Sequence, residues 1–259
     1  MTSEAGRELT RREFSHQAER FERPGYIFGD REILDWIRAP LPLDSASLVL
    51  DVAGGTGRLG RHLAREAACA VIVDLTSEML AEGTRAAREE DARNVVFLSG
   101  DAGSLPFAEQ QFDLVVCRFA LHHFEDPGVA VGEMARVCRA GGTVAVIDMA
   151  REPGHAGERQ NELERLRDPS HMTALTEQEM LEHLTGAGLE DVRRLGERHQ
   201  PMHVGPWLDQ ASPAPETRAE IEHALAGEGT ETGLHPTHDH DGRQGIVHRW
   251  VIVAGTRAI

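Results

Sequence analysis

The chain has 259 residues and a formal net charge of −16, with 27 basic against 43 acidic side chains. This excess of negative charge repels nucleic-acid phosphates and anionic lipids, and no apolar run approaches the roughly 18 residues that cross a bilayer. The N-terminal segment lacks the apolar centre of a secretory signal, and three cysteines without a C-x-x-C pair argue against a disulfide framework. We therefore expect a soluble, cytoplasmic protein of one large domain, with or without a cap, and no nucleic-acid or membrane partner.

The N-terminal region predicts helices. Residues 8–38 carry apolar side chains at helical spacing, and the pattern is interrupted at "RPGYIFGD", residues 23–30, by Pro24 and two glycines. We assign residues 1–40 to a helical cap. This cap is expected to cover the open edge of the sheet that the following residues predict.

Residues 48–149 alternate short apolar runs with amphipathic stretches. Runs of roughly four to eight residues, separated by helices of about ten to fourteen, predict parallel strands wound on both sides of one sheet. The runs show little polar alternation, as expected of strands that are covered on both faces. The five runs are "SLVLDV", "CAVIVDL", "NVVFL", "FDLVVC" and "GGTVAVIDM".

The remaining residues predict further helices and two final strands. The stretch "RQNELERLRDPSHMTALTEQEMLEHLTGAGLE" splits into two helices at Asp168-Pro169, and Thr176 followed by Glu179 predicts a capping box for the second helix. The segments "EDVRRLGERHQPMHV" and "GIVHRWVIVAG" are the predicted strands, with a helix and a long polar loop between them. We expect residues 41–259 to form the main domain, with lid insertions near 151–175 and 200–243.

A glycine-rich loop follows the first predicted strand. In "LDVAGGTGRLGRHLA", residues 50–64, the pattern G-x-G-x-x-G falls at Gly55, Gly57 and Gly60. A turn from a parallel strand into a helix offers free backbone N–H groups and the positive end of a helix dipole, so an anion is expected there. In dinucleotide enzymes the anion is a pyrophosphate, and an acidic residue about 20 positions on binds the ribose. Asp74 meets that condition too, so the loop alone does not exclude a dinucleotide as the ligand.

Two further carboxylates favour a cationic nucleoside. Asp51 lies at the end of the first strand, where its carboxylate is expected to face a ligand over the loop, and this opposes two phosphates. Asp101, in "GDAGSLPF" after the third strand, is placed to accept a hydrogen bond from an exocyclic amine such as that of adenine. S-Adenosylmethionine carries a carboxylate, an ammonium, a ribose and an adenine, and it fits all of these features.

Five successive motifs resemble those of class I S-adenosylmethionine-dependent methyltransferases, in particular the small-molecule branch that includes the ubiquinone and menaquinone C-methyltransferases. The resemblance covers roughly residues 10–257, and one departure is Gly54-Gly55, where relatives often carry Gly-Cys or Cys-Gly. It implies a Rossmann-like, doubly wound α/β sheet of seven strands, mostly parallel with an antiparallel last strand, plus a helical lid. The motifs are "VLDVAGGTGRLGRHLA", "VIVDLTSEML", "GDAGSLPF", "FDLVVCRFALHHFEDP" and "CRAGGTVAVIDM".

The resemblance also implies which residues bind the cofactor. Asp74 would bind the ribose, Leu75 and Met79 would flank the adenine, and Arg118 would hold the methionine carboxylate. The residues implied at the methionine end are Asp51, Ala53, Gly54, Gly55 and Gly57, and those at the adenine amine are Asp101 and Ala102.

Three histidines are candidates for proton transfer. Methyl transfer is an in-line displacement in which the protein mainly aligns the reactants, but a hydroxyl nucleophile must also lose its proton to a base, and histidine exchanges protons near neutral pH. "ALHHFEDP" places His122 and His123 after the fourth strand, beside the predicted sulfonium, and His123 is our first candidate. His171, in the predicted lid, is expected to approach from above. For each of them a purely structural role is the alternative.

Aromatic side chains are candidate walls for an apolar substrate, although at helical or strand spacing they more often belong to the core. We expect Phe14 and Tyr26 first, and then Phe21 and Trp207. The segment "HPTHDHD", residues 235–241, carries metal-ligating residue types. It is a polar loop with no second cluster to complete a site, so no metal is expected.

These features predict an enzyme that methylates a small apolar or aromatic metabolite, on oxygen before carbon, and that is compatible with a homodimer. Two alternatives stay open. One is a protein that keeps the cofactor without transferring its methyl group, such as a cyclase, because cofactor binding and methyl acceptance are separate sites on one fold. The other is an NAD(P)-dependent oxidoreductase that uses the same glycine loop.

Overall fold

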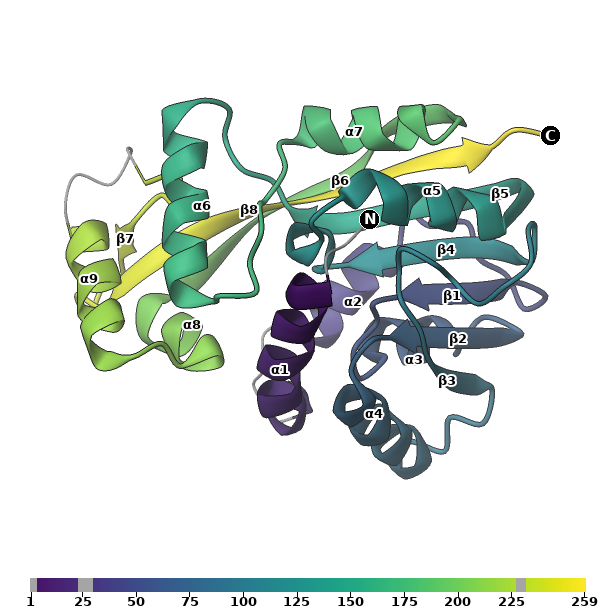
Figure 1. Cartoon of the computed structure of the whole chain (residues 1–259), viewed down its shortest axis with the longest axis horizontal. Coiled ribbons are helices and arrows are strands. Elements are labelled where there is room, and N and C mark those ends of the chain that lie inside the picture. Colours follow the sequence, from purple (N-terminus) through teal and green to yellow (C-terminus); the bar gives the residue numbers. More distant parts are fainter. Residues whose placement is uncertain (1–3, 23–29, 227–231) are drawn as a thin grey trace.

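One mostly parallel sheet organises the computed structural model, which describes residues 4–22, 30–226 and 232–259. Across the sheet that these residues form, the strand order is β3-β2-β1-β4-β5-β8-β6, and β8 runs antiparallel to both of its neighbours (Figure 1). The predicted doubly wound α/β sheet with an antiparallel last strand is confirmed. The strands are β1 (Leu48–Val52), β2 (Cys69–Asp74), β3 (Val95–Ser99), β4 (Phe112–Arg118), β5 (Cys138–Met149), β6 (Leu189–His203) and β8 (Gln244–Arg257).

A short strand that was not predicted lies beside this path. β7 (Thr237–His238) pairs antiparallel with β8, so the described sheet has eight strands and not seven. Two residues are too few to show an apolar run or an alternation, and the segment therefore resembles a polar loop in the sequence.

Helices cover both faces of the sheet, because successive residues of the central strands point to opposite sides and both sides are apolar. In β1, Val49 belongs to the core beneath α2 (Arg31–Arg38) and α3 (Arg58–Leu63), whereas Leu50 belongs to the core beneath α5 (Pro127–Val137) and α7 (Glu177–Gly186). The helices are α1 (Glu4–Phe21), α2 (Arg31–Arg38), α3 (Arg58–Leu63), α4 (Ser77–Glu89), α5 (Pro127–Val137), α6 (His155–Arg167), α7 (Glu177–Gly186), α8 (Val204–Ala211) and α9 (Pro215–Ala226), with a 3₁₀ turn at Leu121–His123.

The helix boundaries after β5 follow the local sequence signals, as predicted. α6 ends at Arg167, and Asp168 has extended backbone angles because it precedes a proline. The capping box of α7 is complete. The Thr176 side chain accepts from the backbone N–H of Glu179 at 3.2 Å, and Glu179 Oε2 accepts the Thr176 N–H at 2.7 Å.

α8 was not predicted. Its sequence begins with Val204, Gly205 and Pro206, and glycine and proline ordinarily argue against a helix. Pro206 nevertheless lies in the first turn, where its missing N–H would have had no intrahelical acceptor.

α1 does not cover an edge of the described sheet, so that expectation is wrong for this helix, whereas α2 contacts the edge strand β6, where Glu32 pairs with Arg198 at 3.0 Å. The edges of the described sheet are β3 and β6, whereas α1 crosses the carboxyl ends of the parallel strands and packs on α4 and α8. α2 lies on one face, with Ile33, Leu34 and Ile37 in the core. The inner side of α1 mixes Phe14 with Gln17, and this composition suits the wall of a cavity better than a hydrophobic core.

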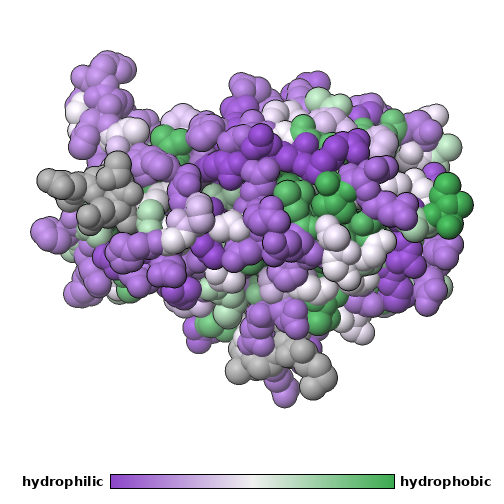
Figure 2. Space-filling view, turned by 90° about the horizontal axis from the view of Figure 1, so that it is seen from above, coloured by the Kyte–Doolittle hydropathy of each residue, from purple (hydrophilic) through white to green (hydrophobic). Residues whose placement is uncertain are grey.

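The face of the molecule that is seen from above is mainly hydrophilic, with apolar residues gathered toward the right-hand side of the view (Figure 2). Within the described ranges, no helix has both the length and the apolar character needed to cross a membrane. In the same ranges, no three His, Cys, Asp or Glu side chains are grouped to hold a metal ion, and His238 and His240 are exposed.

Thr176→Ala is expected to lower the free energy of unfolding by about 1 kcal/mol, because the backbone N–H of Glu179 loses its acceptor. Urea unfolding followed by circular dichroism measures this as a lower midpoint with an unchanged slope. Thr185→Ala in the same helix is the control, since its hydroxyl donates to Leu181 O on an exposed face and its loss should cost less than about 0.5 kcal/mol. Equal losses in both variants would contradict the prediction.

Candidate active site

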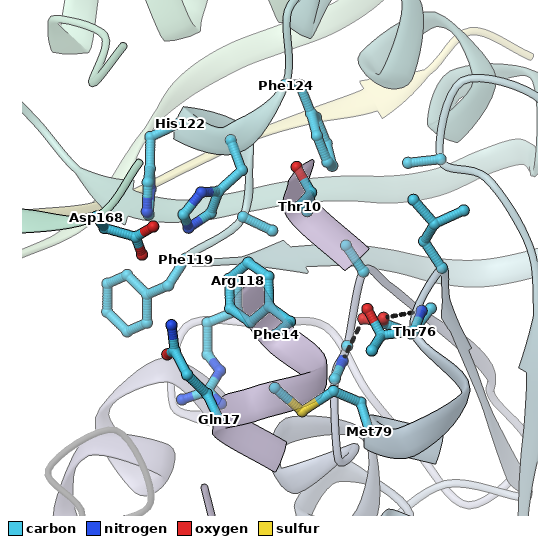
Figure 3. Close-up of a pocket in the computed structure, with 18 of the residues that line it drawn as sticks. Thr10, Phe14, Gln17, Thr76, Met79, Arg118, Phe119, His122, Phe124 and Asp168 are labelled. Carbon is cyan, nitrogen blue, oxygen red and sulfur yellow. Dashed lines mark hydrogen bonds between the residues drawn. The ribbon is translucent and has the colours of Figure 1, made fainter. Parts of the chain in front are cut away.

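A cavity opens at the carboxyl ends of β1 to β4, at the point where the strand order changes direction (Figure 3). Crevices at this position are the usual ligand sites of open α/β sheets. α1, the loop after β1 and the end of α6 complete the wall. The structure brings together on this wall nine of the residues implied for the cofactor: Ala53, Gly54, Gly55, Asp74, Leu75, Met79, Asp101, Ala102 and Arg118.

The loop after β1 depends on its glycines, as Gly54 and Gly57 show. A Cβ on Gly54 would lie 2.8 Å from the carboxylate of Asp51. Gly57 has a φ of +73°, and Ile72 would lie 2.8 Å from its Cβ. The Gly57 N–H donates to Gly54 O at 2.8 Å, which closes a tight turn and lets the loop backbone approach the cavity. Gly57 itself shapes the turn and does not reach the described wall.

Asp51 lies beneath this loop and does not face the cavity, which corrects the sequence prediction. Its Oδ2 accepts the backbone N–H of Gly60 at 2.8 Å, because the absence of a side chain on Gly54 leaves room for the carboxylate. Its Oδ1 is buried without a hydrogen-bond partner among the described residues. Burial raises the pKa of Asp51 to about 6, against the lowering effect of the Arg118 charge. A cation placed above this layer would stabilise the ionised carboxylate.

Asp74 ends β2 and presents its carboxylate to the cavity. Oδ2 accepts the N–H of Gly55 and Oδ1 accepts that of Thr76, each at 2.8 Å. Burial raises the pKa of Asp74, and these two hydrogen bonds lower it in part. The carboxylate is thereby fixed in one orientation with lone pairs left over, which suits the two hydroxyls of a ribose.

His122 is paired with a carboxylate that the sequence analysis did not single out. Its Nδ1 lies 2.6 Å from Oδ1 of Asp148, near the end of β5, and both side chains are buried. Burial acts to lower the pKa of His122, but the charge and hydrogen bond of Asp148 outweigh it, so the pKa is raised. The signal that could have found Asp148 is its position, because it is an acidic residue at the end of a parallel strand, like Asp74.

His123 also lines the cavity, in a different environment. Its Nδ1 lies 3.0 Å from Ser170 O and 3.1 Å from Ser170 Oγ, and that hydroxyl donates to Asp168 at 2.6 Å. Burial, followed by the charge of His122, lowers the pKa of His123 to about 4. The ring of Phe14 meets His123 edge-on at a centroid distance of 4.9 Å. His123 is therefore a neutral imidazole at neutral pH.

His171 does not approach the cavity from above, contrary to expectation. It is buried behind His122, with ring centroids 5.3 Å apart, and it does not reach the described wall. Its Nε2 donates to Asn161 Oδ1 at 2.9 Å, and Asn161 also accepts the N–H of Ala174. Burial, with the charge of His122, lowers the pKa of His171 to about 2. This histidine fixes the loop that follows α6.

The aromatic candidates divide between the cavity and the core. Phe14 and Phe21 lie on the cavity wall, whereas Tyr26 falls outside the described residues. Trp207 was wrongly expected there: α8 turns it into the core, where it is 1% exposed. The wall also includes residues that were not expected, among them Gln17, Phe119, Met149 and Gln210.

Arg167 is a further wall residue that sequence reasoning missed. Its Nε donates to Oε2 of the fully buried Glu164 at 2.9 Å, and its guanidinium lies 5.0 Å from the ring centroid of Trp207. Burial acts to raise the pKa of Glu164, but the charge of Arg167 together with the hydrogen bond and charge of His248 outweighs it, and the pKa is lowered. Glu164 and Arg167 are three residues apart, as in many exposed ion pairs on helices. The sequence therefore carried no sign that this ion pair is buried.

The chain is similar to known methyltransferases. Residues 49–142 match the family described as the methyltransferase domain. The uncharacterized methyltransferase YcgJ of Bacillus subtilis (strain 168) is 31% identical over 214 residues, which is 81% of this chain and 83% of that protein. The crystal structure of YcgJ has a TM-score of 0.82 at 26% identity, covering 89% of this chain and 100% of that one.

Quinone-modifying enzymes match a shorter part. The ubiquinone/menaquinone biosynthesis C-methyltransferase UbiE of Roseobacter denitrificans is 34% identical over 134 residues, 51% of this chain and 52% of that protein. The demethylmenaquinone methyltransferase of Thermobifida fusca is 34% identical over 109 residues, 42% of this chain and 46% of that protein. The chain thus spans about half the length of these two relatives.

Asp148→Asn is expected to lower the pKa of His122, because the imidazolium loses the negative charge that, with its hydrogen bond, offsets the effect of burial. NMR titration of the ring protons measures the shift. Since the folded-state pKa of His122 is raised above 6.5, the pair contributes stability that is fully present below pH 6.5 and lost as pH rises through the folded pKa. The loss of unfolding free energy in the variant should therefore be largest in acid, and a loss independent of pH would contradict the prediction.

Proposed function

Because the chain belongs to the S-adenosylmethionine-dependent methyltransferases, we propose that it methylates a small apolar or aromatic metabolite, with oxygen favoured over carbon as the acceptor atom. S-Adenosylmethionine is the cofactor of the family. The relatives described above are named methyltransferases, which argues against an NAD(P)-dependent oxidoreductase. The identity of the acceptor atom is inferred from the chemistry of the cavity.

The residues of the cavity fit this cofactor. Asp74 offers lone pairs to the ribose, and Asp101 offers an acceptor at the adenine end. Oδ1 of Asp51 is a buried acceptor without a hydrogen-bond partner among the described residues, and an ammonium group nearby would supply positive charge. Arg118 lies on the cavity wall, close enough for its charge to act on Asp51, and it is suited to bind the methionine carboxylate of the cofactor. We assign the adenine-flanking role to Met79 and Leu75.

S-Adenosylmethionine supplies a methyl group that its positively charged sulfur already makes electrophilic. The chain therefore has to align the acceptor, exclude water and take up a proton where the acceptor is a hydroxyl. Phe14, Phe119 and Met149 provide apolar walls around the acceptor end. His122 and Asp168 lie at this end, away from Thr76 and Met79 (Figure 3).

The observation that carries the preference for oxygen is the pair formed by His122 and Asp148. The carboxylate holds Nδ1 as the donor, which leaves Nε2 as a proton acceptor, and it stabilises the imidazolium that forms. A base is most effective when its pKa lies near the working pH. The raised pKa of His122 meets this condition better than the pKa of about 4 of His123. We therefore assign the base to His122, in place of His123, and give His171 a structural role.

We further propose that the cap, residues 1–40, and the insertions near 151–175 and 200–243 enclose the acceptor. α1 contributes Gln17 to the wall, the end of α6 contributes Arg167, and α8 contributes Gln210. Enclosure supports the reaction because a dry site strengthens the electrostatic interactions within it and keeps water from competing as an acceptor.

The test is transfer of label from S-adenosylmethionine with a radioactive methyl group to a panel of phenols, hydroxylated aromatics and their carbon-nucleophile analogues. Product analysis by mass spectrometry should find one added methyl group, on oxygen. Turnover of an acceptor without label in the product would instead support a protein that retains the cofactor, such as a cyclase. Labelled product on carbon alone would overturn the preference for oxygen.

His122→Asn is expected to lower kcat for a hydroxyl acceptor by about 10²- to 10⁴-fold with little change in the Kd for S-adenosylmethionine, because a general base is lost and the cofactor contacts are not. In wild type, kcat should rise with pH through the raised pKa of His122 and then level off, and in the variant this rise should disappear. His199→Asn is the control, because the His199 side chain is 65% exposed. Loss of kcat without loss of the pH dependence would argue that His122 is not the base.

A further inference from the structure

One side of α1 forms a wall of the cavity along the whole length of the helix. The wall residues Arg7, Thr10, Phe14, Gln17 and Phe21 recur every three or four positions, which is the spacing of a single helix face. Figure 3 shows this helix crossing the cavity with Thr10, Phe14 and Gln17 on it. α1 is therefore a roof, and its contacts with the rim decide how firmly the cavity is covered.

At the N-terminal end of this roof, Arg7 meets the carboxylate of Asp101. Oδ1 of Asp101 accepts the backbone N–H of Gly103 at 2.8 Å, and Oδ2 pairs with Nη1 of Arg7 at 2.9 Å. The side chains of Arg7 and Asp101 are 38% and 27% exposed, so the pair is partly open to solvent. Asp101 is also the acceptor assigned to the adenine end of the cofactor site. The guanidinium thus lies where an adenine amino group would have to donate.

We propose that Arg7 is a placeholder for the adenine amino group, so that binding of the cofactor exchanges Arg7 for the amine at Oδ2 of Asp101 and releases the N-terminal end of α1. The inference rests on the cofactor site proposed above. Both partners are N–H donors, so the carboxylate keeps a hydrogen bond before and after the exchange. The roof and the nucleoside site are thereby coupled through one carboxylate oxygen.

The C-terminal end of α1 is held separately. Arg20 donates to Ser212 Oγ at 2.8 Å and to the backbone oxygen of Asp209 at 3.2 Å. Glu22, which follows the helix, pairs with the buried guanidinium of Arg61 at 2.7 Å. Release of Arg7 therefore frees one end of the roof while the other end stays attached.

The opposite wall does not take part in the exchange. The backbone N–H groups of Met172 and Thr173 both donate to His122 O, at 2.9 and 3.1 Å, and Ser170 Oγ donates to Asp168 at 2.6 Å. Breaking such buried hydrogen bonds leaves unsatisfied polar groups, which is costly. A partly exposed ion pair exchanges its partner at little cost. The geometry thus assigns the movable part of the cover to α1.

Isothermal titration with S-adenosylhomocysteine tests the exchange. Arg7→Ala should bind this nucleoside roughly two- to fivefold more tightly than wild type, because the adenine amine no longer has to displace Arg7 from Asp101. This factor corresponds to the usual strength of a partly exposed ion pair. Arg7→Lys keeps the charge and should retain the wild-type Kd. Arg11→Ala is the matched control, since Arg11 lies in the same helix, pairs with the exposed Glu8 and is not on the described wall.

The S-ribosylhomocysteine analogue with unsubstituted purine as its base isolates the amino group, because hydrogen replaces the amine in that position. This ligand has no N–H donor on that edge of the ring, so Arg7→Ala should bring no gain in its affinity. An equal gain for both nucleosides would mean that the variant merely loosens α1, and it would overturn the proposal.

Salt gives an independent readout. The gain from Arg7→Ala should shrink as the ionic strength rises from about 0.01 M to about 1 M, because the Debye length falls from about 30 Å to about 3 Å and the competing ion pair is screened. An unchanged or weaker affinity in Arg7→Ala would overturn the exchange and leave the cofactor site in place. Failure of wild type to bind either S-adenosylmethionine or S-adenosylhomocysteine would overturn the proposed function itself.

Discussion

The site depends on one property of the sheet: parallel strands end at a common edge, so whatever follows each strand faces the same space. Asp74 ends β2, Asp101 follows β3, and Asp148 lies near the end of β5. The chain places β2 and β3 on one side of β1, and β4 and β5 on the other. Residues far apart in the sequence therefore meet around one crevice, with Asp51 of β1 one layer below it.

Carboxylates in such a crevice lose hydration and need hydrogen bonds or cations in return. Asp74 has two backbone N–H groups, and Asp148 has the ring of His122. Asp51 is only half satisfied, because Gly60 supplies one donor and Oδ1 has none among the described residues. The second hydrogen-bond donor to Asp101 is Arg7, which lies in α1. Asp51 and Asp101 are therefore the carboxylates that a bound cationic nucleoside would stabilise most, by adding a positive charge or a hydrogen-bond donor.

Two adjacent histidines show how strongly the surroundings decide chemical character. In a 3₁₀ turn, successive side chains point in different directions. His122 turns toward Asp148, which raises its pKa, and His123 turns toward Ser170, where burial lowers its pKa to about 4. His122 is thereby the stronger base of the two, and His123 remains uncharged at neutral pH. The residue type is identical, so the difference arises from contacts with β5 and with the loop after α6.

The sequence by itself determined the features that depend on near neighbours. The apolar runs predict the parallel strands, the capping box at Thr176 predicts the start of α7, and the end of a strand puts Asp74 on the cavity wall. Tertiary structure alone decided the turn of Asp51 beneath the loop, the burial of Trp207 in the core and the pairing of Arg7 with a residue 94 positions away. Local sequence patterns predict whether a segment is a helix or a strand and where it begins and ends. The direction of a side chain is set by the element packed against it, which comes from a distant part of the chain.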